Sequence, residues 1–133
     1  MKASSLAALN DAFWGYAAGT VAILLTEAAE VTSQLEPQAA AAALETGGIS
    51  INNFNTTLPV RKGLSSSAAV CVLVVRAFST IFGWNLSHRV EMELAYRGER
   101  LTRSRCGRMD QACAFGKTPV LLVGVCTMRL VSM

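Results

Sequence analysis

The sequence is poor in charge, in histidine and in paired cysteines, and these shortages exclude several classes of site. Only 16% of its 133 residues are charged, and His88 is the single histidine. The four cysteines contain no Cys-x-x-Cys pair, and the single histidine does not complete the usual spacing pattern of a structural zinc site. We therefore expect free thiols, as is usual in the reducing cytosol, and a cytoplasmic protein.

Long apolar runs are also missing, although hydrophobic residues make up 52% of the chain. The longest runs, Val70–Val75 and Val120–Val125, have the length of a buried helix face or a strand and are far too short to cross a bilayer. Asp11 interrupts the apolar stretch near the N-terminus, which argues against a secretory signal. These features predict no membrane partner.

Basic residues are in slight excess, but they do not form the footprint of a nucleic-acid binder. The net charge is +3 and the isoelectric point is about 8.9. Proteins that bind single-stranded nucleic acid interleave basic and aromatic residues along a groove, and the sequence has no such stripe. We expect no nucleic-acid partner.

The apolar content is itself informative, because a mean hydropathy of +0.38 is high for a soluble monomer. The length suffices for one domain with a real core. A surface meant for another domain and a homodimer would explain the excess apolarity equally well. In either case we expect exposed apolar surface through which copies of the chain can associate.

The chain is organised around a Gly/Ser-rich loop, Pro59–Ala69, that joins two segments of different character. Before it, Ile49–Leu58 is rich in β-branched residues, which predicts a strand. After it, Ala68–Phe82 is almost wholly apolar and lacks glycine and proline, which predicts a buried helix. A helix N-terminus that follows a Gly/Ser loop offers unpaired N–H groups and the positive end of the helix dipole, which together favour phosphate binding.

Other interpretations account for less of this loop. A plain N-cap needs one serine, whereas Ser65, Ser66 and Ser67 follow one another. A Walker P-loop needs Lys and then Ser or Thr directly after its last glycine, but Leu64 follows Gly63. The Gly-x-Ser-x-Gly motif of a nucleophile elbow is not completed either. We therefore predict that this loop binds phosphate, with simple helix capping as the alternative.

The segments on both sides of the loop are predicted to be mainly helical. Residues 1–46 are rich in alanine, and apolar residues recur there at helical spacing. Gly83 is expected to end the helix that follows the loop, and Ser87 is expected to cap the next helix, at about residues 88–101. The apolar residues of this last helix lie near one face: Val90, Leu94 and Leu101.

An arginine cluster leads from that helix into a second motif, Cys106–Gln111. The cluster consists of Arg97, Arg100, Arg103, Arg105 and Arg108. The cluster suits a solvated helix end, since cations interact favourably with a helix C-terminus. Its positive charge would also attract a polyphosphate. An aspartate beside a turn is commonly a cap. Phosphoryl transfer, however, needs both a metal ligand and a group that orients the attacking hydroxyl, and Glu99 and Asp110 could fill these roles.

The two motifs resemble those of the GHMP kinases, the small-molecule kinases that include galactokinase, homoserine kinase and mevalonate kinase. Pro59–Ala68 agrees with the second signature of that family, Pro-x-x-x-Gly-Leu-x-Ser-Ser-Ala, at every specified position. The resemblance implies an α+β domain in which helices pack on a sheet, as in the N-terminal domain of these kinases. It also implies ATP and Mg²⁺ as cofactors, with the phosphates cradled by Pro59, Gly63, Leu64, Ser65, Ser66, Ser67 and Ala68.

The second motif is similar to the Cys-Gly-x-Met-Asp-Gln of galactokinase-like members, in which the aspartate is the proposed catalytic base. This resemblance assigns the role of base to Asp110 and makes Glu99 and Ser67 ligands of Mg²⁺. It implies transfer of the γ-phosphoryl group of ATP to a hydroxyl of a small metabolite. A sugar is the first choice of acceptor.

The first signature of the family, near its N-terminus, and the third, in its C-terminal domain, are not found in the chain. We therefore expect residues 1–133 to be a single, incomplete N-terminal domain that is cut at both ends and lacks the C-terminal domain. Such a chain should bind Mg²⁺–nucleotide weakly and turn over poorly by itself. Two alternatives stay open, namely a non-catalytic regulatory module that binds nucleotide or sugar, and a helical interaction domain whose serine loop is coincidental.

Overall fold

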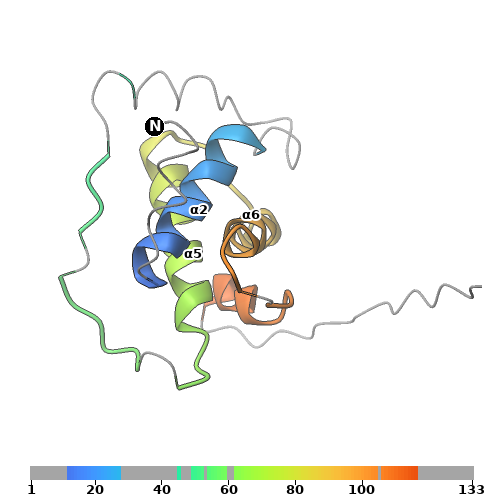
Figure 1. Ribbon diagram of the computed structural model, residues 1–133. Helices are drawn as coiled ribbons and strands as arrows, with labels where there is room; N and C mark the ends of the chain where they lie inside the picture. The colour runs from blue at the N-terminus through green and yellow to red at the C-terminus, as the bar shows by residue number, and fades with distance from the viewer. Residues whose placement is uncertain are drawn as a thin grey trace, which may run out of the picture.

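The computed structural model describes residues 12–27, 45, 49–52, 54–59, 62–104 and 106–116. The helical elements in this part are α2 (Ala12–Thr26), α5 (Ser66–Ile81), α6 (His88–Arg100) and the 3₁₀-helix η1 (Asp110–Phe115). As Figure 1 shows, the three α-helices pack on one another, and η1 lies beside the N-terminal end of α5. None of the described helices is long and apolar enough to span a membrane.

The strand expected over Ile49–Leu58 is not formed. The described residues of this segment are irregular, and the described part of the chain offers no strand with which they could pair. A strand is held by hydrogen bonds to a neighbouring strand, so a run of β-branched residues does not produce one by itself. Ile49 and Ile51 are nevertheless half-buried against the helical core. The described part is all-helical, and the sheet of the predicted α+β fold is not among its residues.

α5 confirms the helix expected after the loop, although only one of its faces is buried. It begins at Ser66 and is followed by Gly83, whose φ of +65° is a conformation that glycine adopts at little cost. On the opposite face, Leu73 and Ile81 are 64% and 59% exposed, because α2, α6 and η1 do not cover it. The expectation of a buried helix therefore holds for one face only. The buried residues recur at helical spacing: Ala68, Cys71, Val72, Val74, Val75 and Phe78.

α6 agrees with its predicted bounds to within one residue. Ser87 caps it, since its hydroxyl accepts a hydrogen bond from the Val90 N–H at 3.4 Å. Leu94 is fully buried as expected, but Leu101 is exposed, which corrects the predicted apolar face. Small and acidic side chains complete the buried face instead: Glu91, Ala95, Gly98 and Glu99. Buried acids of this kind are not indicated by apolar periodicity.

α2 and α6 cross so closely that both carry glycine at the contact. A Cβ atom added to Gly98 would lie 2.5 Å from Oγ1 and 2.6 Å from Cα of Thr20. One added to Gly19 would lie 2.6 Å from the carbonyl oxygen of Gly98. Thr20 is fully buried at this crossing, and its hydroxyl donates to the Tyr16 carbonyl at 2.9 Å, so it needs no partner from α6. The crossing therefore excludes any side chain at Gly98.

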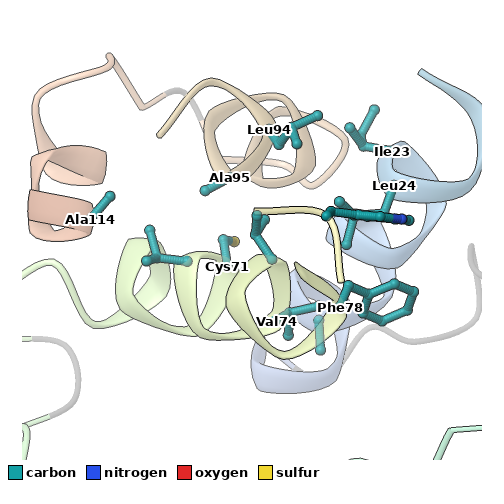
Figure 2. Close-up of a cluster of buried hydrophobic side chains, with 12 residues drawn as sticks. Ile23, Leu24, Cys71, Val74, Phe78, Leu94, Ala95 and Ala114 are labelled. Carbon is teal, nitrogen blue, oxygen red and sulfur yellow. The ribbon is translucent and has the colours of Figure 1, made fainter. Parts of the chain in front are cut away.

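One hydrophobic core joins the helices. Its aromatic part is a group of neighbouring rings, in which Phe82 and Trp84 stack with their centroids 5.5 Å apart and Phe78 lies 5.6 Å from Phe82. Burying each large apolar side chain contributes about 1.5–3 kcal/mol, so this core holds the helices together. Figure 2 shows its members converging from α2, α5, α6 and η1, with labels on Ile23, Leu24, Cys71, Val74, Phe78, Leu94, Ala95 and Ala114.

Cys71 lies in this core, and we expect its thiol to be unreactive in the native protein. Burial raises its pKa to about 12, well above the ordinary value of 9.0. Since the thiolate is the reactive form, native Cys71 should react with iodoacetamide at pH 8 about a thousandfold more slowly than it does after unfolding in urea.

Trypsin separates this thiol from its neighbours, because Cys71 falls in the peptide Gly63–Arg76 and Cys106 in the peptide Cys106–Arg108. Mass spectrometry of the labelled peptides therefore measures each rate. Cys106 is only half-buried and serves as the internal control. Equal labelling of Cys71 and Cys106 in the native protein would contradict the buried position of Cys71.

Candidate active site

The loop before α5 places two residues in the left-handed region of backbone conformation. Gly63 has a φ of +71°, and Ser65 has a φ of +57° with a ψ of +34°. This conformation costs glycine little, but it strains a residue with a Cβ by about 1–2 kcal/mol. A Cβ atom added to Gly63 would meet nothing within 4 Å, so the backbone conformation, and not crowding, is what favours glycine there. Strain at Ser65 is typical of a position held by contacts that serve a function.

Ser65 precedes α5 directly, yet its side chain makes no capping hydrogen bond. Its hydroxyl donates instead to Oδ1 of Asp110 at 3.0 Å, which joins the two sequence motifs across 45 residues. The simple capping interpretation is therefore wrong for Ser65. The first backbone N–H groups of α5 therefore receive no hydrogen bond from the Ser65 side chain, and they can donate to an anion. Ser66 and Ser67 occupy the first turn of α5 and are half-buried.

The other residues of the predicted phosphate cradle divide between the surface and the core. Pro59, Gly63 and Leu64 are exposed, whereas Ala68 is fully buried in the first turn of α5. The side chain of Ala68 packs inward, so any part that Ala68 plays in binding falls to its backbone N–H. A phosphate bound here would therefore contact backbone groups and serine hydroxyls at the start of α5, whose inner side is fixed by the core.

Asp110 begins η1, and this short helix is anchored to both neighbouring helices. Arg76 of α5 donates to the Ala114 carbonyl near the far end of η1. The same guanidinium forms a 3.0 Å ion pair with Glu91 of α6, a carboxylate that is almost fully buried. Asp110 itself is half-buried. Arg76 therefore ties α5, α6 and η1 together, and the first residue of η1 is held against the loop.

Glu99 is 1% exposed, and both oxygens of its carboxylate accept hydrogen bonds. Gln111 Nε2 donates to Oε2 at 2.6 Å, and the Ser104 hydroxyl donates to Oε1 at 3.2 Å. The amide oxygen of Gln111 is buried and has no partner in the part of the chain that is described. Carboxylate, amide and hydroxyl oxygens are the hard donors that Mg²⁺ prefers, so the chemistry of this cluster fits the ion that the family resemblance implies at Glu99.

Ser67, the other predicted ligand, is not joined to Glu99 by a hydrogen bond in the structure. Within the described ranges, no group of three or more His, Cys, Asp and Glu side chains is placed to hold a metal ion. A magnesium ion held with a nucleotide commonly has few protein ligands and several from phosphates and water, so such a group is not required. The assignment of Glu99 and Ser67 as ligands stays a prediction.

The arginine cluster is partly neutralised. Arg97 and Arg108 both bind the carboxylate of Glu93, at 3.2 and 2.8 Å, and Arg97 also pairs with Glu27 at 3.2 Å. Hydrogen bonding to Arg108, followed by that to Arg97, holds the pKa of Glu93 below its ordinary value. These pairs favour the interpretation of Arg97 and Arg108 as part of a solvated helix surface. Arg105 lies outside the described residues.

Sequence reasoning assigned no role to Arg76, Glu91 or Gln111. A signal was present for Arg76, because it is the single charged residue in the apolar stretch Ala68–Phe82. A lone charge on an apolar helix needs a partner, and charged groups are buried only when they are paired. The partners themselves could not be found in the sequence, since they come from α6 and η1.

A comparison with protein-family models matches residues 24–117 to the family described as GHMP kinases N terminal domain. The matched range includes the loop, α5, α6 and η1, and therefore both motifs and all the contacts described for the site. Searches of curated proteins and of solved structures gave no match. The family match spans most of the chain and agrees with the resemblance seen in the two motifs.

Proposed function

Since this chain belongs to the GHMP kinase family through its N-terminal domain, we propose that it transfers the γ-phosphoryl group of ATP, with Mg²⁺, to a hydroxyl of a small metabolite. ATP-dependent phosphorylation of small molecules is the general activity of the family. The observation that supports the proposal best is the hydrogen bond from Ser65 to Asp110, at 3.0 Å. It holds the carboxylate of one motif against the phosphate loop of the other, so an acceptor at Asp110 would be close to the phosphates.

In this proposal Asp110 orients the acceptor hydroxyl and accepts its proton. A general base must lie within hydrogen-bond reach of the proton that it takes. The Ser65 hydroxyl donates to Oδ1 of Asp110, and this contact demonstrates that an O–H group can approach the carboxylate from the loop side. The anchoring of η1 by Arg76 keeps the carboxylate in place, which is what positioning catalysis requires.

The phosphates would be bound at the start of α5 and along the loop. Backbone N–H groups of the first turn, the hydroxyls of Ser66 and Ser67, and the close approach permitted at Gly63 would provide this cradle. Glu99 and Ser67 would hold Mg²⁺, which neutralises the charge on the phosphates when it is bound with the nucleotide. All of these groups except Glu99 lie on the loop or at the start of α5.

For the acceptor we propose a sugar. The support is the similarity of Cys106–Gln111 to the Cys-Gly-x-Met-Asp-Gln of galactokinase-like members. A sugar also offers several hydroxyls at which a single base such as Asp110 can act.

The experiment is a transfer assay with the complete chain, Mg²⁺, ATP radiolabelled in its γ-phosphate, and one acceptor at a time. Hexoses, homoserine and mevalonate represent three acceptor classes. We expect label on a hexose at a low rate, because an incomplete domain should turn over poorly, and we expect none when the metal is removed with EDTA. Label on homoserine or mevalonate alone would support kinase activity and contradict a sugar as the acceptor. Binding of Mg²⁺–ATP without transfer to any acceptor would overturn the kinase proposal and favour a non-catalytic binding module.

A further inference from the structure

Gln111 belongs to the second motif, but the proposed function gives it no role. Its side chain is fully buried, and its amide N–H donates to Oε2 of Glu99 at 2.6 Å. In this contact the amide nitrogen of Gln111 faces the carboxylate, and the carboxylate oxygen accepts. The amide oxygen is therefore the end without a partner, and a buried acceptor in this state calls for a donor that the described residues do not supply.

The described surroundings of Glu99 are also informative, because the donors that hold its carboxylate carry no charge. Its donors Ser104 and Gln111 are both neutral, and so is the Cys106 thiol that also bonds to it. No ion pair to Glu99 is found among the described residues. A purely structural buried carboxylate is usually paired with a cation, as Glu91 is with Arg76 in the same protein. The two carboxylate oxygens of Glu99 are therefore held by neutral donors, and no described residue supplies a cation to them.

We propose that Gln111 is a positioning residue, which holds the Glu99 carboxylate in the orientation needed to bind a divalent cation. The inference rests on the proposed function, in which Glu99 ligates Mg²⁺. Gln111 stands next to Asp110 in η1, so one short helix carries the base and also holds the metal ligand on α6. Partners of metal ligands that act in this way change metal affinity by about 10–100-fold when they are replaced.

The test is Mn²⁺ binding to the complete chain with ATP, followed by electron paramagnetic resonance, with Mn²⁺ as the probe in place of Mg²⁺. Gln111→Met keeps the length of the side chain and removes the amide. We expect it to weaken Mn²⁺ binding about 10–100-fold. The affinity for ATP in EDTA should change less than about twofold, because the phosphate cradle lies on the loop and α5.

A double variant separates positioning from support of the fold. In the Glu99→Gln background, Gln111→Met should have no further effect on Mn²⁺ binding, because the carboxylate that it positions is gone. Val75→Ala is the control for lost stability, since Val75 is fully buried in α5 and has no polar group that could act on a metal site. Its Mn²⁺ affinity should equal that of the wild-type chain at a temperature where both are folded.

Each of the other outcomes is decisive. Mn²⁺ binding that depends on Glu99 but not on Gln111 would overturn this inference alone. An equal loss for Gln111→Met in the wild-type and Glu99→Gln backgrounds, or an equal loss in Val75→Ala, would also overturn it. If the wild-type chain binds no Mn²⁺ with ATP, or if Glu99→Gln binds it as well as the wild type, the proposed role of Glu99 fails and this inference fails with it.

Discussion

The Gly98→Ala variant should unfold at a much lower temperature than the wild-type chain. The new methyl group would lie 2.5 Å from Oγ1 and 2.6 Å from Cα of Thr20, distances at which non-bonded atoms cannot remain. Oγ1 belongs to a side chain that can rotate, but Cα belongs to the backbone of α2. The two helices must therefore move apart, and the core that they share with α5 must loosen.

The size of this effect follows from two opposing terms. Overpacking a core costs about 1–3 kcal/mol, and a clash with backbone belongs at the upper end of that range. Alanine is better than glycine in a helix by about 1 kcal/mol, which offsets part of the loss. A net loss of about 2 kcal/mol corresponds to a fall of about 7 °C in the unfolding midpoint of a chain of this length. Circular dichroism during heating measures the midpoint.

Gly107→Ala is the matched control, because a Cβ atom at Gly107 would meet nothing within 4 Å and its φ is not positive. Its midpoint should stay within about 2 °C of the wild-type value. Adding Thr20→Ala to Gly98→Ala should restore only part of the loss, since it removes Oγ1 and leaves Cα in place. Equal midpoints for Gly98→Ala and Gly107→Ala would show that the helices do not cross as described.

The Asp110→Asn variant should lose most phosphoryl transfer while it still binds nucleotide. Asparagine has nearly the same shape and can still accept the hydrogen bond from Ser65, so the contact between the motifs persists. It cannot accept a proton from the acceptor hydroxyl. General-base catalysis contributes about 10²–10⁴-fold, and we expect the rate of acceptor phosphorylation to fall by that factor. Affinity for Mg²⁺–ATP, measured by calorimetry, should change less than about twofold.

Ser65→Ala is the companion variant, because it removes the hydrogen bond and leaves the carboxylate. We expect a smaller loss of transfer than with Asp110→Asn, since the base is present but less firmly held. Unfolding midpoints of both variants should be close to that of the wild type, because neither side chain is fully buried. If the phosphorylation rate of Asp110→Asn stays within twofold of the wild-type rate, Asp110 is not the general base. A loss of nucleotide binding as large as the loss of transfer would place Asp110 in the binding site instead.

Local features of this protein were determined by the sequence alone. The bounds of α5 and α6, the cap at Ser87 and the helix end before Gly83 depend on residues a few positions apart, and they agree with prediction to within two residues. Both motifs could also be recognised in the sequence, and the family match to residues 24–117 confirms the family that they indicated. The sugar acceptor and the roles of individual site residues stay predictions.

Tertiary contacts decided the rest, because they join residues that no local pattern relates. Ser65 looked like a helix cap, but its hydroxyl bonds Asp110, 45 residues away. Gly98 has no special signal in α6, and only the approach of α2 at Thr20 makes glycine necessary there. The β-branched residues before the loop predicted a strand, which requires a partner that the described part does not provide. Helices and caps are determined by neighbouring residues in the chain, whereas a strand, a close helix crossing and an active site exist only once distant segments have met.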